Sequence, residues 1–357
     1  MPPCHQSPFG EPCLVIGTSS SEIDPAIDWG FRTVSFPQAL GGTSARNFML
    51  YQRPTVGSLQ LWADSVQDQS YNWHNFLPYF QKSLEYNPDA FIPTGGPLQV
   101  SFPDYAQPFS SYLPSGFDEI GISPAVDFSS GTLKGAQYCP MTIDPDGSFR
   151  ASSQETYLTA SMNCTNLKVF DLTMAKKILF DTPEKTRSVF RLTTPNSHSG
   201  IGPSTTLKKL RIPVIVDNVN VGQNMWDHVL AAVTFPIATD SATRFVNGLT
   251  GSQDAVYQAE SVARWETNGT GPLSNNNADF LAWEKFPDSL DSRKFPSDWP
   301  ELEYIGASGY FGNFYTNDLP IINPNWLDHP SDQATLLAGF KRVREVFASK
   351  AVQRGLS

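Results

Sequence analysis

Cysteine and histidine are both scarce in this chain, which contains 4 and 5 of them among its 357 residues. The cysteines form no CxxC pair, and the histidines form no HxH or HxxxH pattern. Neither a disulfide framework nor a metal site is therefore indicated. We expect free thiols and no bound metal.

Long apolar runs and an excess of basic residues are missing as well. No window approaches about 18 consecutive apolar residues, so no segment is predicted to span a membrane. Lys and Arg total 25 against 35 Asp and Glu, and a net charge of −10 argues against nucleic-acid binding. The N-terminal residues resemble no signal peptide, which leaves the cytoplasm as the default expectation. The sequence does not indicate an oligomeric state.

Aromatic residues, by contrast, are plentiful. They make up 12% of the chain, with 24 Phe, 12 Tyr and 8 Trp, and hydrophobic residues make up 40%. Such a composition indicates a globular protein with a sizeable core, and aromatic side chains also line pockets for flat ligands. The 29 prolines indicate long irregular connections.

Two segments have the apolar periodicity of amphipathic helices. In the first, Asn72 is a suitable N-cap, and Pro78 is expected to kink or shorten the helix. Its apolar residues are Trp73, Phe76, Leu77, Phe80 and Leu84. The second segment is expected to begin at Ser331 or Asp332. Its apolar residues are Leu336, Leu337, Phe340, Val343, Val346 and Phe347.

Shorter segments complete the expected secondary structure. Residues 151–158 indicate a short helix, and residues 205–217 a short helix followed by a strand at 214–216. Strand-like runs of β-branched and aromatic residues occur at 167–180, 230–237, 278–283 and 302–308.

The stretch from Gly41 to Leu50, GGTSARNFML, is the first candidate binding segment. Glycine lets the backbone approach a ligand closely, because no Cβ intervenes. Thr43 and Ser44 are suitable to cap a helix whose first N–H groups meet an anion or a flat ring. From composition alone, a simple tight turn before a helix is the better-supported alternative.

A second candidate lies in residues 219–229, where Asp227 and His228 are adjacent. Neighbouring residues of an extended chain point to opposite sides, which argues against an acid–base pair. We expect these two residues and Asn224 to hydrogen-bond the backbone instead.

The motifs, taken in order, resemble those of the glucose–methanol–choline (GMC) oxidoreductases. GGTSARNFMLYQR is similar to the first signature of that family, and LWADSVQDQSYNWHNFLPYFQKS continues it. SGIGP at 199–203 resembles the core of the second signature, and residues 320–347 resemble the segment that follows the substrate domain. The sequence of residues 41–82 is most similar to the fungal branch of this family that includes versicolorin B synthase.

This resemblance implies a mixed α/β fold and oxidation of an alcohol by FAD. An incomplete Rossmann-like FAD-binding part is expected in residues 1–230, and residues 85–160 are expected to contribute partly to the substrate domain. An antiparallel-sheet substrate domain is expected in 231–325, and a helix in 326–357 is expected to return to the FAD-binding part. The implied partner is a small-molecule alcohol or polyketide substrate of fungal secondary metabolism.

The resemblance also implies which residues contact the cofactor. Gly41, Gly42 and the run Asn47, Phe48, Met49 and Leu50 are expected to lie along the flavin. Ala175 is expected where the family backbone contacts adenine. No catalytic residue is assigned, because the histidine-containing C-terminal segment of the family has no counterpart.

The departures from the family pattern keep two alternatives open. The sequence contains no GxGxxG, the turn that holds the FAD pyrophosphate in such proteins, and the region between 180 and 199 is short. The chain is therefore expected to be truncated at both ends, which would make it a catalytically inactive family member. The other alternative is a non-redox cyclase or dehydratase, whose aromatic polyketide would lie against Phe48, Tyr51, Trp62 and Tyr138.

Overall fold

The computed structural model describes residues 41–45, 47–86, 95–162, 166–170, 200–223, 229, 231, 233–242, 244–245, 254–287, 290, 295–309 and 330–356. The chain divides into two compact units. Unit 1 comprises Met1–Cys164 with Ala232–Ser357, and unit 2 comprises Thr165–Ala231. The boundaries expected from the sequence stay predictions.

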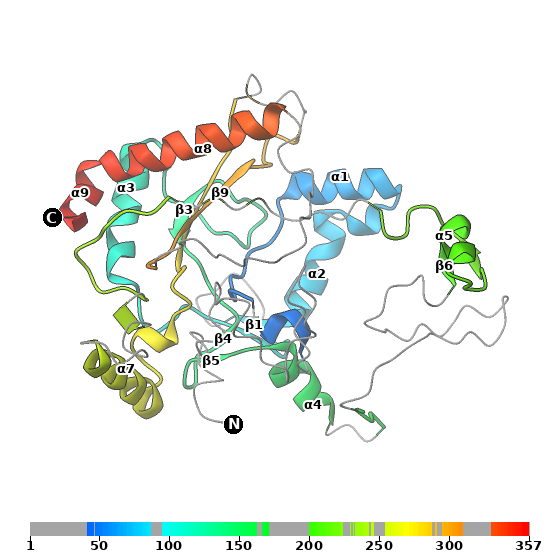
Figure 1. The fold of residues 1–357 in the computed structure, drawn as a ribbon, viewed down its shortest axis with the longest axis horizontal. Coiled ribbons are helices and arrows are strands. Elements are labelled where there is room, and N and C mark those ends of the chain that lie inside the picture. Colours follow the sequence, from blue (N-terminus) through cyan, green and yellow to red (C-terminus); the bar gives the residue numbers. More distant parts are fainter. Residues whose placement is uncertain are drawn as a thin grey trace. The chain divides into compact units, whose positions relative to one another are not determined.

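A three-stranded antiparallel sheet forms the centre of unit 1 (Figure 1). Its strands are β3 (Gly135–Tyr138), β8 (Phe280–Glu284) and β9 (Leu302–Gly306), and β8 lies in the middle. Tyr138 pairs with Phe280 across β3 and β8. The predicted strands at 278–283 and 302–308 are thus confirmed, and so is the expectation of a mixed fold with an antiparallel sheet.

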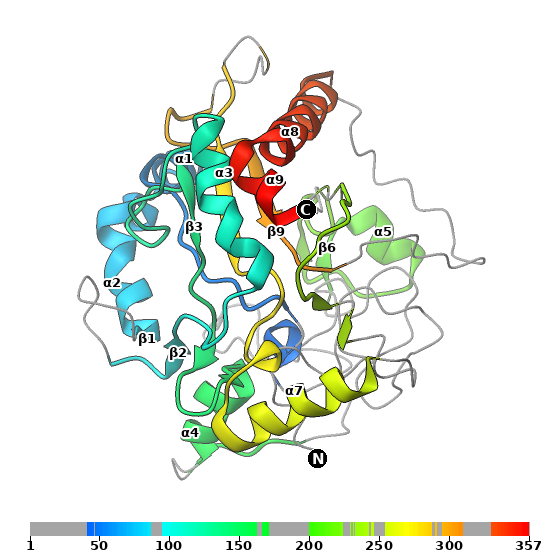
Figure 2. The same cartoon turned by 90° about the vertical axis from the view of Figure 1, so that its left-hand side faces the viewer.

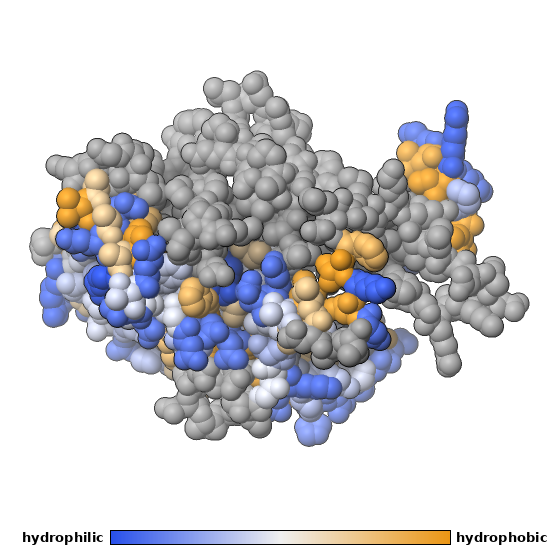
Figure 3. Space-filling view, turned by 90° about the horizontal axis from the view of Figure 1, so that it is seen from below, coloured by the Kyte–Doolittle hydropathy of each residue, from blue (hydrophilic) through white to orange (hydrophobic). Residues whose placement is uncertain are grey.

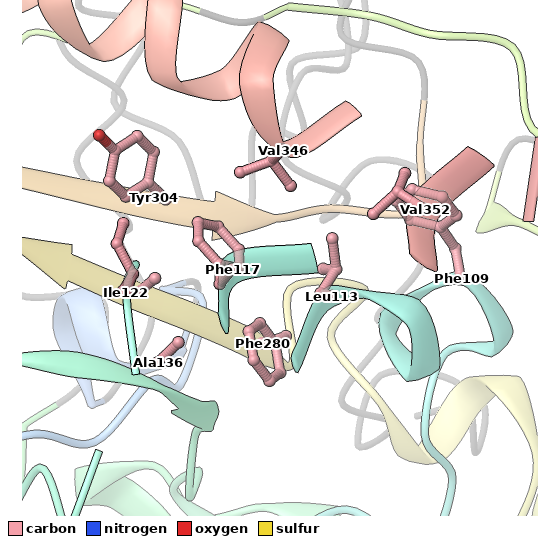
Figure 4. Close-up of a cluster of buried hydrophobic side chains, with 10 residues drawn as sticks. Phe109, Leu113, Phe117, Ile122, Ala136, Phe280, Tyr304, Val346 and Val352 are labelled. Carbon is pink, nitrogen blue, oxygen red and sulfur yellow. The ribbon is translucent and has the colours of Figure 1, made fainter. Parts of the chain in front are cut away.

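Helices cover one face of this sheet and bury the main hydrophobic core. The 3-10 helix η6 (Pro108–Tyr112) leads into α3 (Leu113–Glu119), which packs beside α8 (Pro330–Ala348) and α9 (Lys350–Leu356) (Figures 1 and 2). Figure 4 shows the side chains that meet there. The ring of Phe117 lies 5.9 Å from that of Phe280 and 5.6 Å from that of Tyr304. Aromatic residues therefore serve mainly to join the helices to the sheet.

Two residues of the apolar face predicted for helix α8 are exposed in the structure. Leu337 and Phe340 are 55% and 45% exposed, although the periodicity assigned them to the core. The buried residues of the helix are Ser331, Thr335, Gly339 and Val346. Val343, Val346 and Phe347 pack on the main core as predicted. Gly339 lies against Leu302 of β9, where a Cβ would not fit, so a small residue is also required on the packed face.

Helices α1 (Val56–Val66) and α2 (Trp73–Ser83) form a hairpin through the 3-10 turn η5 (Gln69–Tyr71). The Asn72 side chain accepts a hydrogen bond from the Asn75 N–H at 3.0 Å, which confirms the predicted N-cap. The helix continues through Pro78. Leu84 is fully buried, but it belongs to the next strand rather than to the helix.

The remaining strands of unit 1 are short. β1 (Leu84–Tyr86) pairs in parallel with β2 (Leu98–Val100), and β4 (Ile143–Asp144) forms a hairpin with β5 (Phe149–Arg150). The predicted helix at 151–158 is present as a π-helical turn, η7 (Gln154–Leu158), which continues into α4 (Thr159–Met162). Helix α7 (Ala255–Asn268) and the 3-10 turn η9 (Pro272–Ser274) precede the central strand.

Unit 2 is described for two segments and two single residues. β6 (Ile201–Gly202) pairs in parallel with β7 (Val216–Asp217), and α5 (Ser204–Lys209) connects them. Gly200 has a φ of +89°, and a Cβ on it would lie 2.5 Å from the Pro213 carbonyl oxygen. Only glycine therefore fits this position of the SGIGP motif.

Two strand predictions are wrong for the residues that the structure describes. Residues 167–170 are not in a strand, and neither are the described residues between 230 and 237. The predicted strand at 214–216 is found one to two residues later, as β7. The rest of the predicted strand pair, from 171 to 180, lies outside the described residues.

The surface of the described residues mixes polar and apolar side chains. Small groups of hydrophobic residues lie among hydrophilic residues on the face that Figure 3 shows. Among the helices described, none combines the length and the hydrophobicity needed to cross a lipid bilayer.

Candidate functional site

The candidate segment begins with a glycine pair in left-handed conformation. Gly41 has a φ of +94° and Gly42 a φ of +58°, values that glycine adopts without strain. A single 3-10 turn, η4 (Gly42–Ala45), follows. The predicted helix capped by Thr43 and Ser44 is wrong, because the described residues from 47 to 55 are not helical.

Serine side chains close this turn onto the start of η7. The Ser44 hydroxyl donates to the Gly41 carbonyl at 2.6 Å and accepts from the Ser153 N–H at 2.9 Å. The Ser153 hydroxyl donates to the same carbonyl at 3.0 Å. A Cβ on Gly41 would lie 3.2 Å from Gln154, so this glycine serves the packing of the turn.

Asn47 starts a second turn, in which Met49 is the unusual residue. Met49 has a φ of +61°, which is uncommon outside glycine, asparagine and aspartate. The Asn47 side-chain oxygen accepts from the Met49 N–H at 3.0 Å. The Met49 side chain is buried with Met141 and Ile143, and the residue as a whole is 1% exposed.

The segment then pairs with the residues that lead into β4. Leu50 forms an antiparallel bridge with Met141, and the Tyr51 N–H donates to the Pro140 carbonyl at 2.9 Å. Leu50 also packs against two hydrophobic clusters. Phe48 is half-buried and Asn47 is exposed.

Three successive carbonyl groups of the turn accept hydrogen bonds from separate parts of unit 1. The Arg150 guanidinium donates to the Asn47 carbonyl at 2.7 Å. The Asn276 side-chain amide donates to the Phe48 carbonyl. The Thr142 N–H donates to the Met49 carbonyl at 2.8 Å. The backbone of the turn is therefore fixed at three consecutive residues.

Burial changes the proton affinity of several groups near the turn. It lowers the pKa of Arg150 to about 10, so this residue stays charged at neutral pH. It raises the pKa of Tyr51, a shift that the neighbouring Arg53 opposes. The Cys139 thiol is fully buried, and burial raises its pKa. A thiol of this kind is not reactive.

Arg53, at the end of the family-like Tyr-x-Arg motif, is also buried. It is 3% exposed, and its guanidinium donates to the Ser129 carbonyl and to the Tyr51 hydroxyl, both at 3.2 Å. Its guanidinium carbon lies 5.5 Å from the centre of the Phe80 ring. This arginine therefore connects the C-terminal end of the candidate segment to α2.

A network of buried polar groups lies at the start of β8, next to Asn276. The Asp279 carboxylate accepts from the Ser110 hydroxyl at 2.5 Å, the Gln107 N–H at 2.8 Å and the Asn275 amide at 2.9 Å. Burial raises the pKa of Asp279 above its ordinary value, although these donors act in the opposite direction. The network fixes the loop that carries Asn276.

The structure brings together most of the residues chosen from the sequence. Gly41, Gly42 and residues 47–50 form one continuous wall with η7 and the β4–β5 hairpin. Their contact with a flavin stays a prediction. Ala175, Asn224, Asp227 and His228 lie outside the described residues.

Other sequence-based expectations concern aromatic and metal-binding side chains. Trp62 is 57% exposed on α1 and stacks on Tyr71, whereas Tyr138 packs against Phe280. Within the described ranges, no group of three or more His, Cys, Asp or Glu side chains is arranged to hold a metal ion.

Sequence reasoning missed Asn276 and gave Arg150 no role. The signal for Asn276 was the run Asn275–Asn277 directly before a predicted strand, because amides at such a place must find buried partners. The contact partner, Phe48, is 228 residues away and could not be read from the pattern.

The backbone of Gly42 is open on one side. Among the described atoms, none lies within 4 Å of the place where a Cβ on Gly42 would stand. A flat ring can approach the backbone there, and contact with the flavin of FAD stays a prediction. The sequence provides no GxGxxG for its pyrophosphate.

Curated relatives match nearly the whole chain. Patulin synthase of Aspergillus clavatus is 31% identical over 95% of this chain and 68% of its own length. Versicolorin B synthase of Emericella nidulans is 31% identical over 93% of this chain and 65% of its own length. The first alignment has 437 positions, more than this chain has residues, so that relative carries internal segments with no counterpart here.

Solved structures have the same fold at low sequence identity. A fungal aryl-alcohol oxidase superposes with a TM-score of 0.72 over 98% of this chain and 77% of its own, at 15% identity. An FAD-dependent oxidoreductase from Chaetomium thermophilum gives 0.71 over 91% and 71%, at 20% identity. The sequence profile of the GMC oxidoreductases matches residues 28–198. The chain therefore belongs to the GMC oxidoreductase family, a family of FAD-binding enzymes.

Proposed function

We propose that this protein is an FAD-dependent oxidoreductase that oxidises an alcohol group of a small molecule in a fungal secondary-metabolite pathway. Family membership supports the cofactor and the reaction class. The names of relatives such as patulin synthase and versicolorin B synthase support a natural-product substrate. One structural observation carries the proposal for this chain, namely the glycine-led turn whose backbone is fixed at three successive carbonyls.

The turn from Gly41 to Leu50 would hold the ring portion of the flavin. Gly42 presents bare backbone on the side where no described atom lies within 4 Å, and Met49 keeps its side chain in the core. Asn47 and Phe48 would contact the ring edge. Ala175 would lie near the adenine. When bound, the flavin supplies a hydride acceptor.

The chain's own residues would prepare the site for this chemistry. The Ser44 and Ser153 hydroxyls keep the Gly41 turn closed, and Leu50 excludes water by packing between two apolar clusters. A rigid wall of this kind lowers the ordering cost of binding. An alcohol also needs a base within hydrogen-bond reach to take its hydroxyl proton.

The first experiment measures cofactor uptake. The purified chain is mixed with FAD, freed of excess ligand, and examined for the visible absorbance of bound flavin. We expect one flavin per chain. A preparation that unfolds cooperatively but retains no flavin would contradict the proposal and favour a catalytically inactive family member.

The second experiment measures the reduction of bound flavin by a panel of aromatic and aliphatic alcohols in the absence of oxygen. Loss of the oxidised flavin absorbance on adding an alcohol is the expected result. Conversion of an aromatic polyketide while the flavin spectrum stays unchanged would instead favour the non-redox cyclase.

A further inference from the structure

We propose that Arg150 and Asn276 are positioning residues, which hold the backbone of Asn47–Met49 in the conformation that binds the flavin ring. This inference rests on the proposed function for its ligand. Its structural part, the control of the turn by two distant side chains, can be tested without the ligand.

The left-handed conformation of Met49 is the starting point. A non-glycine residue with a φ of +61° is rare, and such a conformation persists only where the surroundings over-determine it. Backbone strain of this kind is found preferentially at ligand-binding and catalytic sites. Met49 lies in the candidate segment, so its conformation requires a structural cause there.

The cause is a set of three donors that reach three consecutive carbonyls. The Thr142 donor is a backbone N–H and cannot be removed by changing a side chain. The other two donors are the side chains of Arg150 and Asn276. They come from β5 and from the loop before β8, which are more than 120 residues apart, so tertiary structure alone brings them to the turn.

Among the described residues, the Arg150 guanidinium forms its hydrogen bonds with this segment. One guanidinium nitrogen lies 2.7 Å from the Asn47 carbonyl oxygen, 3.3 Å from the Asn47 side-chain oxygen and 3.5 Å from the Ser44 carbonyl oxygen. No carboxylate of the described residues forms an ion pair with Arg150. A half-buried arginine is usually paired with a carboxylate. For Arg150, the bonds to the turn are the main interactions among the described residues.

The backbone of Arg150 and the side chain of Asn276 are each held by contacts outside the turn. Arg150 pairs with Ile143 through the backbone of the β4–β5 hairpin. The Asn276 side-chain oxygen accepts from the Ala278 N–H at 2.8 Å, which orients the amide group toward Phe48. The turn is therefore preorganised, and preorganisation increases affinity because less ordering is needed on binding.

The test compares Arg150→Met, Arg150→Lys and Asn276→Asp with the unchanged chain. Asn276→Asp keeps the acceptor for Ala278 and replaces the donor to Phe48 with a carboxylate oxygen, which repels the carbonyl when it is ionised. Arg344→Met is the matched control, because Arg344 is exposed on α8. Two quantities are measured: hydrogen exchange of the backbone amides of residues 41–53 without FAD, and the dissociation constant of FAD by fluorescence.

We expect faster exchange in the 41–53 segment and about tenfold weaker FAD binding in Arg150→Met and Asn276→Asp. Arg150→Lys should recover part of the affinity, because it keeps the charge but not the planar fork. A variant that combines Arg150→Met with Asn276→Asp should lose less affinity than the product of the two single losses, because both side chains hold one turn. Arg344→Met should behave like the unchanged chain. Should Arg150→Met fail to fold, Arg150→Lys and Asn276→Asp carry the comparison.

Two results would overturn the inference. One is unchanged exchange of residues 41–53 in Arg150→Met and Asn276→Asp. The other is unchanged FAD affinity in both variants while the unchanged chain binds FAD. If the unchanged chain takes up no FAD, the proposed function fails, and the exchange measurement alone decides whether the two side chains hold the turn.

Discussion

Among single residues near the candidate site, Asp279 has a buried carboxylate that accepts hydrogen bonds from several neighbours. Its carboxylate is 1% exposed and accepts three hydrogen bonds, from Ser110, Gln107 and Asn275. A buried donor that loses its acceptor costs the full desolvation penalty of that group. Asp279 therefore stabilises the loop that carries Asn276.

Replacing Asp279 by Ala should lower the free energy of unfolding by about 3 kcal/mol, because it leaves three buried donors without an acceptor. Urea denaturation followed by tryptophan fluorescence measures the change. Asp146→Asn is the control, since Asp146 is exposed in the β4–β5 turn, and it should change the stability by less than about 0.5 kcal/mol. Equal effects of the two substitutions would show that the network contributes nothing.

The same residue predicts a dependence of stability on pH. Burial raises the pKa of Asp279 in the folded chain above its ordinary value, so the folded state binds this proton more tightly than the unfolded state. The contribution is fully present below the unfolded pKa of about 4 and is lost as pH rises through the folded pKa. The stability of Asp279→Asn relative to the unchanged chain should therefore increase as the pH rises above about 4. A constant difference, measured by urea denaturation at each pH, would show that the pKa is not raised.

Among the elements, α2 depends on its N-terminal cap. No residue of α2 is fully buried, so tertiary packing contributes less to it than to α3 or α8. The Asn72→Ala substitution should cost about 1 kcal/mol, because the Asn75 N–H loses its acceptor, whereas Asn72→Ser should be nearly neutral. Hydrogen exchange of the α2 amides measures both. Equal exchange rates in the two variants would exclude a capping role.

Helix α3 packs so closely that a methyl group does not fit at Gly116. A Cβ there would lie 2.6 Å from Val352, which is fully buried, and 3.2 Å from the Ser349 hydroxyl. Overpacking costs about 1–3 kcal/mol, while alanine gains about 1 kcal/mol of helix propensity.

Gly116→Ala should therefore destabilise the protein by about 1 kcal/mol, as measured by thermal and urea denaturation. Ser115→Ala changes the neighbouring, exposed position of the same helix. It should be neutral or slightly stabilising. A stabilised Gly116→Ala variant would mean that α9 moves easily away from α3.

For the whole molecule, cofactor binding and stability are linked. A ligand that binds only the folded state raises its stability, by about 2.7 kcal/mol at a free concentration of 100 times the dissociation constant. FAD should therefore raise the midpoint of thermal unfolding in proportion to the logarithm of its concentration, and riboflavin should do so less. No shift at any FAD concentration would contradict the proposed function.

Two sequence-based predictions that depended on short-range rules were confirmed, whereas the expected helix capped by Thr43 and Ser44 was wrong. Asn72 caps α2 because its side chain reaches an N–H three residues away. The strand at β8 was indicated by a run of apolar and aromatic residues that is buried in the sheet. Predictions based on periodicity alone were weaker. Leu337 and Phe340 are exposed, whereas Gly339 lies against Leu302 of β9.

Sequence alone was sufficient for the family, for the Asn72 cap of α2 and for the glycine-led turn, since each depends on residues close together in the chain. Only the tertiary structure decided that Arg150 and Asn276 meet the turn at Asn47 and Phe48. Those contacts join residues that are 103 and 228 positions apart. Contacts over such distances depend on how the sheet, the hairpin and the loop before β8 pack together, and no local pattern contains that information.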